Sequence, residues 1–447
     1  MDTISNPAFS LSGLIGTAKS ICGAASLPAD LSATPGARDG GYMPAFVGTV
    51  LLLRLQRTAS EPTQRYLQAL LDARLSPTWR AGASEAAARR GLRSALEGAA
   101  GGVLLWEGRQ LEASEGLEVA SITDSARADV DFDALEAQLD ISGALAVHVY
   151  DAAHHLFKGA DICAAMTLEG IRGETGAFDA RLHELGRPYP GQIAAARNVR
   201  RIVADSEFTT EDARMEFGGD SGPRCQDAIS IRAVPQTHGG GRDALAWFAA
   251  TLEGSLQQSV ASRDMTLDYA LDLLAIGLID LAVISERRSF RMLDSRMSYG
   301  LPMNLVAENP GFNHGFPVIQ AAAAAVVAEM KLKAPKGRGQ GSFSALTGRY
   351  VPRGISSSIR LVELMDLLGK VLAIELFMAS QAMDLTRRTL PNRAFGAGSA
   401  PALAATRTHL PMVLQNRFAS DDMNVAEWLI VQGTIVRAVE DAIGRLD

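Results

Sequence analysis

The chain has 447 residues, of which 47% are hydrophobic and 21% charged, with a formal net charge of −7 at pH 7. That length and apolar content are enough for a large buried core. Lys and Arg are not concentrated in any segment, which excludes a nucleic-acid-binding footprint. The apolar runs are too short and too often interrupted by charges to predict a membrane span, so we expect no membrane partner.

The three cysteines, Cys22, Cys163 and Cys225, are far apart in the sequence and show no metal-binding spacing. Such a set is typical of a reducing compartment. The N-terminus shows no basic start followed by an apolar run, so we predict no signal peptide. We therefore expect a cytoplasmic protein.

Residues 1–41 are rich in Ser, Gly, Pro and Ala, and contain turn signals such as Leu27-Pro28-Ala29-Asp30. We predict an irregular N-terminal segment over 1–41. The rest, 42–447, is predicted to form one helical domain. This domain can be divided into a small N-terminal part and a long bundle. No internal repeat is present.

Helical periodicity dominates the rest of the chain, and strand alternation is almost absent. Residues 246–293 carry apolar side chains one, three and four positions apart. Residues 356–386 begin at a serine run, which is an N-cap signal, and are apolar on more than one face. A helix that is apolar nearly all round is buried among other helices. We predict an all-α fold built on a bundle of long central helices.

Two polar segments interrupt the helices, at 204–224 and 333–355. The second is a basic, glycine-rich loop that contains Tyr350 and Arg353 between two strong helices. A loop of this length inside a compact helical protein is often functional. The alternative is a solvated basic loop without a role in chemistry.

The segment 224–240 contains Gln226, Asp227, Ser230 and Arg232, followed by a Pro-Gln pair. It resembles the Gln-Asp-x-Tyr-Ser-Leu-Arg-x-x-Pro-Gln signature of the histidine/phenylalanine ammonia-lyase superfamily. Further segments are similar to family motifs in the family's order, and extend the resemblance over roughly 45–447: 156–193, 284–288, 310–316, 328–331, 373–376 and 381–384. The resemblance implies an all-α fold, a homotetramer, and active sites shared between subunits.

The family's lyases build an electrophile, methylidene-imidazolone, from a consecutive Ala-Ser-Gly. The nearest match here is Ala83-Ser84-Glu85, where a glutamate replaces the glycine whose bare backbone allows close approach. We therefore predict that no electrophile forms and that the chain uses no cofactor. The plainer interpretation of Ser84 is an N-cap for a helix that starts at Glu85.

Other parts of the ammonia-elimination machinery also differ from the family pattern. Ile229 stands where the family keeps a catalytic tyrosine, and Ser121-Ile122-Thr123 stands where it has Asn-Gly-Thr. The family's Gly-Asn-Phe-His-Gly loop should fall near 259–265, but no matching residues are present. Its tyrosine loop has no counterpart among the first 41 residues. The resemblance therefore indicates an ammonia-lyase scaffold whose chemistry is lost or replaced.

Several family site positions are retained. The resemblance implies that Arg232 holds a substrate carboxylate, which suits the two parallel hydrogen bonds of a guanidinium fork. It also places Gln226, Asn313 and Ser121 in the substrate-binding set, and Glu329 as an active-site base. The alternatives are a structural ion pair for Arg232, a brace at a helix start for Gln226, and a helical ion pair with nearby lysines for Glu329.

His314 replaces a family serine before a helix, and an imidazole there can act as a general acid or base near neutral pH. A purely structural donor is the competing interpretation. Tyr350 can replace the lost tyrosine, with Arg353 beside it as a substrate-binding residue. His148, Asp151, His154 and His155 lie close in sequence, but they lack a catalytic metal-binding pattern, so we predict no metal site.

Two functions follow as hypotheses. The first is an enzyme without methylidene-imidazolone that acts on an amino-acid-derived or unsaturated carboxylate, by elimination, conjugate addition, isomerisation or cyclisation, in a setting such as specialised metabolism. Its partners are then a small-molecule carboxylate and further copies of the chain. The second is a catalytically inactive relative that serves as a binding or assembly subunit.

Overall fold

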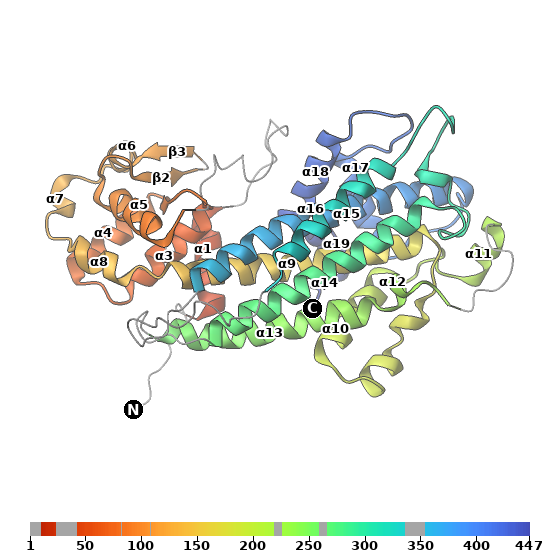
Figure 1. Ribbon diagram of the computed structural model, residues 1–447, viewed down its shortest axis with the longest axis horizontal. Helices are drawn as coiled ribbons and strands as arrows, with labels where there is room; N and C mark the ends of the chain where they lie inside the picture. Colours follow the sequence, from red (N-terminus) through yellow and green to blue (C-terminus); the bar gives the residue numbers. More distant parts are fainter. Residues whose placement is uncertain are drawn as a thin grey trace.

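A computed structural model describes residues 10–23, 43–81, 83–107, 109–218, 226–258, 266–335 and 354–447. An elongated bundle of long helices carries a smaller N-terminal lobe at one end (Figure 1). The predicted all-α fold is confirmed, with a small sheet that periodicity did not predict. None of the described helices is long and apolar enough to cross a membrane.

The N-terminal lobe combines short helices with a small antiparallel sheet. Among the described residues, strand β1 pairs with β2, with Leu75 opposite Trp106, and β2 pairs with β3, with Val103 opposite Glu112. The elements of the lobe are α3 (Ala45–Gln56), α4 (Glu61–Asp72), β1 (Leu75–Thr78), α5 (Glu85–Glu97), β2 (Val103–Trp106), β3 (Arg109–Glu112), α6 (Ala113–Val119), α7 (Asp124–Arg127) and α8 (Phe132–Gln138). The strands have only four residues each, too few to show a clear alternation.

The prediction of an irregular segment over 1–41 is wrong for residues 11–22, which form helix α1 (Leu11–Cys22). The Ser10 hydroxyl accepts a hydrogen bond from the Gly13 amide at 3.1 Å and caps the helix. Leu11 and Leu14 are buried against the bundle, since α1 packs on α3, α9 and α13. The glycines and serines of this segment obscured a two-turn apolar stripe.

The bundle is built on four long helices: α9 (Ile141–Gly170), α13 (Val234–Gln257), α14 (Thr266–Leu293) and α16 (Gly354–Thr389). The helical periodicity of 246–293 belongs to two helices, α13 and α14, and the predicted start of α16 at the serine run is wrong, because α16 begins at Gly354 and buries Ser357 and Ser358. Shorter helices surround the four: α10 (Pro190–Ile202), α11 (Glu211–Phe217), α12 (Ile229–Arg232), α15 (Pro317–Leu332), α17 (Ser399–His409), α18 (Ser420–Val431) and α19 (Thr434–Ile443).

Helices α13 and α14 approach one another closely at two glycines. A Cβ atom on Gly277 would lie only 2.8 Å from the Cα of Gly241, so a side chain cannot be placed there without moving a helix. Small residues therefore set the spacing of this pair. They also leave the outer side of the crossing without side chains to fill it.

Buried polar groups tie the central helices together. Arg288 of α14 and Glu375 of α16 are both fully buried and form two hydrogen bonds, of 2.6 and 2.8 Å. Thr167 of α9 donates to the same carboxylate at 2.9 Å, and Ser285 donates at 2.5 Å. One carboxylate thus links three helices and has its acceptor sites satisfied.

Candidate functional site

The segment that carries Arg232 is held in place by its own backbone and by a buried carboxylate. Asp227 is buried and accepts a hydrogen bond from the Glu174 amide at 2.6 Å. The Nε of Arg232 donates to the backbone carbonyl of Asp227 at 2.8 Å. Arg232 is half-buried and forms no ion pair with any residue that the structure describes. Its two terminal nitrogens make no hydrogen bond to a described residue.

Ile229 and Gln226 lie on the same segment as Arg232. Ile229, at the family's tyrosine position, begins α12 and is 67% exposed. Gln226 is exposed, just before this turn. Gln226 and Arg232 are thus carried within a few residues of one another, as the sequence predicts.

Ile229 lines a broad apolar groove of about 770 Å³ between α12, α13 and α14. The groove exists because its floor is made of small residues, among them Gly240, Gly241 and Gly277. Arg287 and Arg291 stand in its wall: Arg287 pairs with Glu286, and Arg291 donates to the Tyr299 hydroxyl at 3.1 Å. The position of the lost tyrosine therefore opens onto a surface that an apolar group can occupy.

The N-terminal lobe holds the residues that match the electrophile-forming motif. The Ser84 hydroxyl accepts from the Ala87 amide at 3.3 Å and is the N-cap of α5. Glu85 is the first residue of that helix and pairs with Arg89. The capping role predicted for Ser84 is confirmed.

Ser121 also lies in the N-terminal lobe, directly after α6. Its φ is +56°, and its side chain is exposed. Figure 1 shows α6 and α12 at opposite ends of the molecule. In one chain, Ser121 and Arg232 do not share a pocket.

Helix α15 separates two of the predicted catalytic residues. His314 lies before its first turn and Glu329 near its last, so at 1.5 Å per residue roughly 18 Å of helix lies between them. Within one chain the two cannot act on the same small substrate, so both can serve one site only if they come from different copies of the chain. Glu329 is exposed and lies 3.8 Å from Lys333, which is the helical ion pair considered as its alternative.

Asn313, predicted to bind substrate, uses its side-chain amide for hydrogen bonds to the protein backbone. Its Nδ2 donates to the Glu308 carbonyl at 2.7 Å, and its Oδ1 accepts from the Asn416 amide at 2.8 Å. In return, the Asn416 side chain accepts from the His314 amide at 2.9 Å. Asn313 therefore braces two loops, a role that the motif alone does not reveal.

Tyr350 and Arg353 lie outside the described residues, as do residues 336–353 of the basic loop and the segment 259–265. The histidines considered for a metal have other surroundings. Asp151 accepts from Lys19 at 2.6 Å, and Lys19 lies 3.1 Å from the Nε2 of His155. No group of three metal-binding side chains occurs within the described part of the chain.

A buried pair formed by a histidine and an aspartate was not predicted from the sequence. The Nδ1 of His238 on α13 lies 2.7 Å from Asp161 on α9, and both side chains are fully buried. Burial lowers the pKa of His238, although its hydrogen bond to Asp161 opposes this. Burial tends to raise the pKa of Asp161, but Arg242, His238 and Asn198 outweigh it, so this pKa is lowered. Neither residue belongs to a spacing pattern that predicts the contact.

Comparison with known proteins gives a consistent result. The family model for aromatic amino acid lyases matches residues 92–260 and 263–408. A histidine ammonia-lyase of Gloeobacter violaceus is 35% identical over 322 residues, which are 68% of this chain and 60% of that protein. The chain thus spans about three fifths of the length of such curated relatives.

Solved structures of related enzymes have the same fold. The tyrosine aminomutase of Streptomyces globisporus superimposes with a TM-score of 0.77 at 24% identity, over 98% of this chain and 87% of that one. The histidine ammonia-lyase of Trypanosoma cruzi gives a TM-score of 0.74 at 21% identity, over 97% of this chain and 84% of that one. These similarities support the all-α architecture predicted from the sequence.

Proposed function

Because this chain belongs to the aromatic amino acid lyase family, we propose that it is an enzyme of that type that binds a carboxylate at Arg232 and works without methylidene-imidazolone. The single observation that carries the proposal is the state of Arg232. Its Nε is fixed by the Asp227 carbonyl, and it has no carboxylate partner among the described residues. A positioned guanidinium without a protein counter-ion is suited to a planar carboxylate ligand.

The residues at the electrophile-forming position do not fit the group. Glu85 replaces the glycine and lies in the first turn of α5, while the Ser84 hydroxyl is engaged as the helix cap. Closing a ring through these residues would unwind the start of the helix and remove its cap. We therefore derive no step through that electrophile.

We further propose that the site is completed between copies of the chain, as a homotetramer of the family type would do. The candidate site residues occupy separate places in one chain: the N-terminal lobe, α12, the start of α15 and its end. Helix α15 also exposes a continuous apolar stripe of Ala321, Ala325, Ala328 and Leu332. Burying this stripe and the groove beside α12 in subunit contacts removes apolar surface from water.

The substrate class proposed is an amino-acid-derived or unsaturated carboxylate, and the reaction an elimination, conjugate addition, isomerisation or cyclisation. Glu329 of another copy is the candidate base, because its ion pair with Lys333 is exposed and long at 3.8 Å. The second candidate function is an inactive assembly subunit. The observation that favours it is that Asn313 and Ser84 both have structural roles.

A thermal-shift screen tests the proposal. The wild-type chain is heated with aromatic amino acids, with their acrylates such as trans-cinnamate, and with other unsaturated carboxylates. A ligand at about 100 times its Kd stabilises the folded state by about 2.7 kcal/mol. We expect stabilisation by at least one carboxylate, its loss in Arg232→Ala, and its retention in Arg296→Ala, a surface arginine that is a matched control.

Carboxylates that stabilise the protein then enter turnover assays monitored by absorbance and by mass spectrometry. Conversion of such a ligand supports the enzyme. Binding at Arg232 without any conversion supports the inactive subunit. If no carboxylate stabilises the wild-type chain, the carboxylate site itself is wrong.

A further inference from the structure

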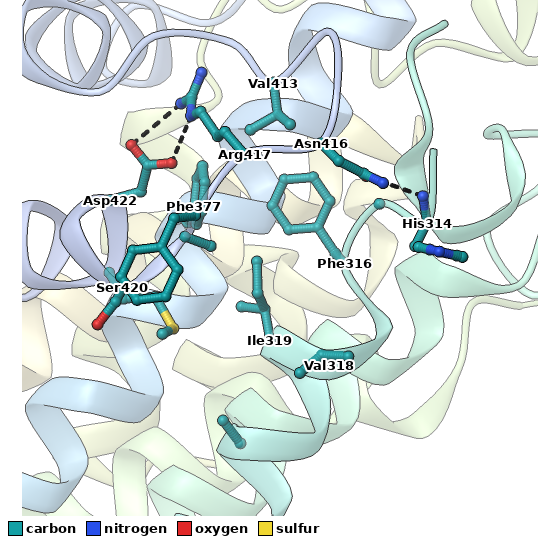
Figure 2. Close-up of a pocket in the computed structure, with 15 residues that line it drawn as sticks. His314, Phe316, Val318, Ile319, Phe377, Val413, Asn416, Arg417, Ser420 and Asp422 are labelled. Atoms are coloured by element: carbon teal, nitrogen blue, oxygen red, sulfur yellow. Dashed lines mark hydrogen bonds and ion pairs between the residues drawn. The ribbon is translucent and has the colours of Figure 1, made fainter. Parts of the chain in front are cut away.

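A second hollow lies away from Arg232, at the start of α15. It has a volume of about 480 Å³ and is enclosed by the first turn of α15, by α16, by the 413–419 loop and by the first turn of α18. Figure 2 shows Phe316, Ile319 and Phe377 on its inner side and His314 at one edge. This volume falls within the range of about 300–1,000 Å³ that is usual for small-molecule pockets.

The interior of the hollow is apolar and aromatic. Phe316 and Phe377 are buried and meet edge to face, with ring centroids 4.9 Å apart. Ile319 and Met423 complete the apolar wall, and Phe418, whose side chain is 80% exposed, presents an aromatic ring to the hollow. A flat aromatic ring is the ligand shape that gains most from such surroundings, because ring–ring contacts add to the effect of apolar burial.

The walls are held by hydrogen bonds that do not involve a ligand. The buried Gln381 donates to the Val413 carbonyl at 2.8 Å and accepts from the Val413 amide at 3.0 Å. Asn313 and Asn416 join the two loops at the opposite side. A preformed pocket loses little conformational entropy when a ligand enters.

The charges at the rim are already balanced. Arg417 donates from Nε to Asp422 at 2.6 Å and from Nη2 to the same carboxylate at 3.2 Å, as the dashed lines of Figure 2 show. Its Nη2 also donates to the Pro411 carbonyl at 2.8 Å. An anionic ligand would have to displace Asp422 from this arginine, so the rim favours a ligand without formal charge.

One polar side chain at the rim is not committed. The imidazole of His314 is exposed and makes no hydrogen bond to a described residue, although its backbone amide is fixed by Asn416. It can therefore bond a single polar substituent at the mouth. This gives His314 a role that does not require Glu329, which lies at the other end of α15.

We propose that this hollow is a binding site for a neutral aromatic molecule that carries one hydroxyl or carbonyl group. The ring lies against Phe418 and the apolar wall, above the buried Phe316 and Phe377, and the polar substituent meets His314 at the rim. The site is separate from Arg232 and does not depend on the carboxylate function proposed for that residue.

Calorimetric titration with 2-naphthol tests the site, with 2-naphthoate as the anionic comparison and 2-decalol as the saturated one. We expect 2-naphthol to bind most tightly of the three. His314→Ala should weaken it about 2- to 10-fold, the usual value of one hydrogen bond. Ala322→Leu, which fills the pocket, should abolish binding, whereas Ala404→Leu on the exposed face of α17 should leave it unchanged.

Each contrary result overturns the proposal in a definite way. Equal or tighter binding of 2-naphthoate contradicts the neutral rim, and equal binding of 2-decalol contradicts the aromatic preference. Loss of 2-naphthol binding in Ala404→Leu, or none in wild type, removes the site. A changed oligomeric state in Ala322→Leu assigns the hollow to a second copy of the chain. Unchanged binding of 2-naphthol in Arg232→Ala keeps this result distinct from the fate of the carboxylate site.

Discussion

Arg288 lies in the interior of the bundle and Arg232 lies toward its end. The two guanidinium groups have opposite surroundings. Arg288 is fully buried and bonds both oxygens of Glu375, whose carboxylate also accepts from Thr167 and Ser285. Arg232 is half-buried, is held only through its Nε by a backbone carbonyl, and has no carboxylate partner in the described part of the chain.

Both arginines belong to motifs that resemble the same family, and the resemblance assigns a substrate carboxylate to Arg232 alone. The structure distinguishes them by the partners of each guanidinium group. A buried charge is costly unless it is paired, and Arg288 is paired with Glu375 through Nε and Nη2, while its buried Nη1 has no hydrogen-bond partner among the described residues. Arg232 does not need a partner for stability, because part of it reaches solvent. The first arginine therefore holds the helices together, and we propose that the second binds a ligand.

The largest expected effect is at the buried pair. Arg288→Met leaves the Glu375 carboxylate buried without its cation, and we expect a loss of about 3–5 kcal/mol in the free energy of unfolding. The same substitution at Arg232 should cost far less. Urea denaturation measures both, and the double variant Arg288→Met with Glu375→Leu should recover much of the loss. Similar losses at Arg288 and Arg232 would erase the contrast between the two regions.

A change in pH should act on the interior before it acts on the Arg232 end. Burial lowers the pKa of His238, and it lowers that of His154 to about 4. In the unfolded chain, histidines bind protons near pH 6.5, whereas these folded ones stay neutral. Stability is therefore complete above about pH 6.5 and falls as the pH decreases toward 4, by up to about 1.4 kcal/mol per pH unit for each proton.

The lowered pKa of Asp161 has the same sign: its contribution is present above about pH 4 and is lost below it. Melting temperatures at pH 8, 7, 6 and 5 measure the effect of the histidines. His238→Gln should be less stable at pH 8 but should show a flatter decline. A wild-type melting temperature that does not fall between pH 7 and 5 contradicts the assignment.

At the electrophile position the expected effect is smaller. Ser84→Ala removes the cap of α5 and should cost about 1 kcal/mol, while Ser84→Asp, which keeps a capping oxygen, should cost little. The intact mass of the wild-type chain should equal that of its sequence. A mass lower by two water molecules, with loss of that difference in Ser84→Ala, would show that the electrophile forms after all.

The fold was accessible from the sequence because long apolar helices such as α9 and α16 leave an unmistakable pattern. Helix α1 and the small sheet were not, since glycines and four-residue strands carry too little periodicity. Ser84 could be assigned a cap because N-capping depends only on neighbouring residues.

The roles of Asn313 and Asp161 depend on partners distant in sequence, Asn416 and His238, which no local motif specifies. The separation of His314 from Glu329, in contrast, follows from helix rise alone once α15 is recognised as one continuous helix. Motif order indicates which family positions are retained. Only geometry shows which of them meet within one chain.

The smallest expected change in stability is at Arg232 itself, and for that reason it is the sharpest test of the contrast. Arg232→Lys keeps the positive charge but loses the planar fork and the Nε that bonds the Asp227 carbonyl. We expect the free energy of unfolding to change by no more than about 0.5 kcal/mol, as for most surface substitutions. Affinity for the carboxylate found in the thermal-shift screen should fall about 10-fold or more, because a lysine cannot form two parallel hydrogen bonds. Calorimetric titration of wild type and Arg232→Lys with that carboxylate separates two interpretations. Equal affinity means that only a point charge is sensed, and a large loss of stability means that Arg232, like Arg288, holds the fold rather than a ligand.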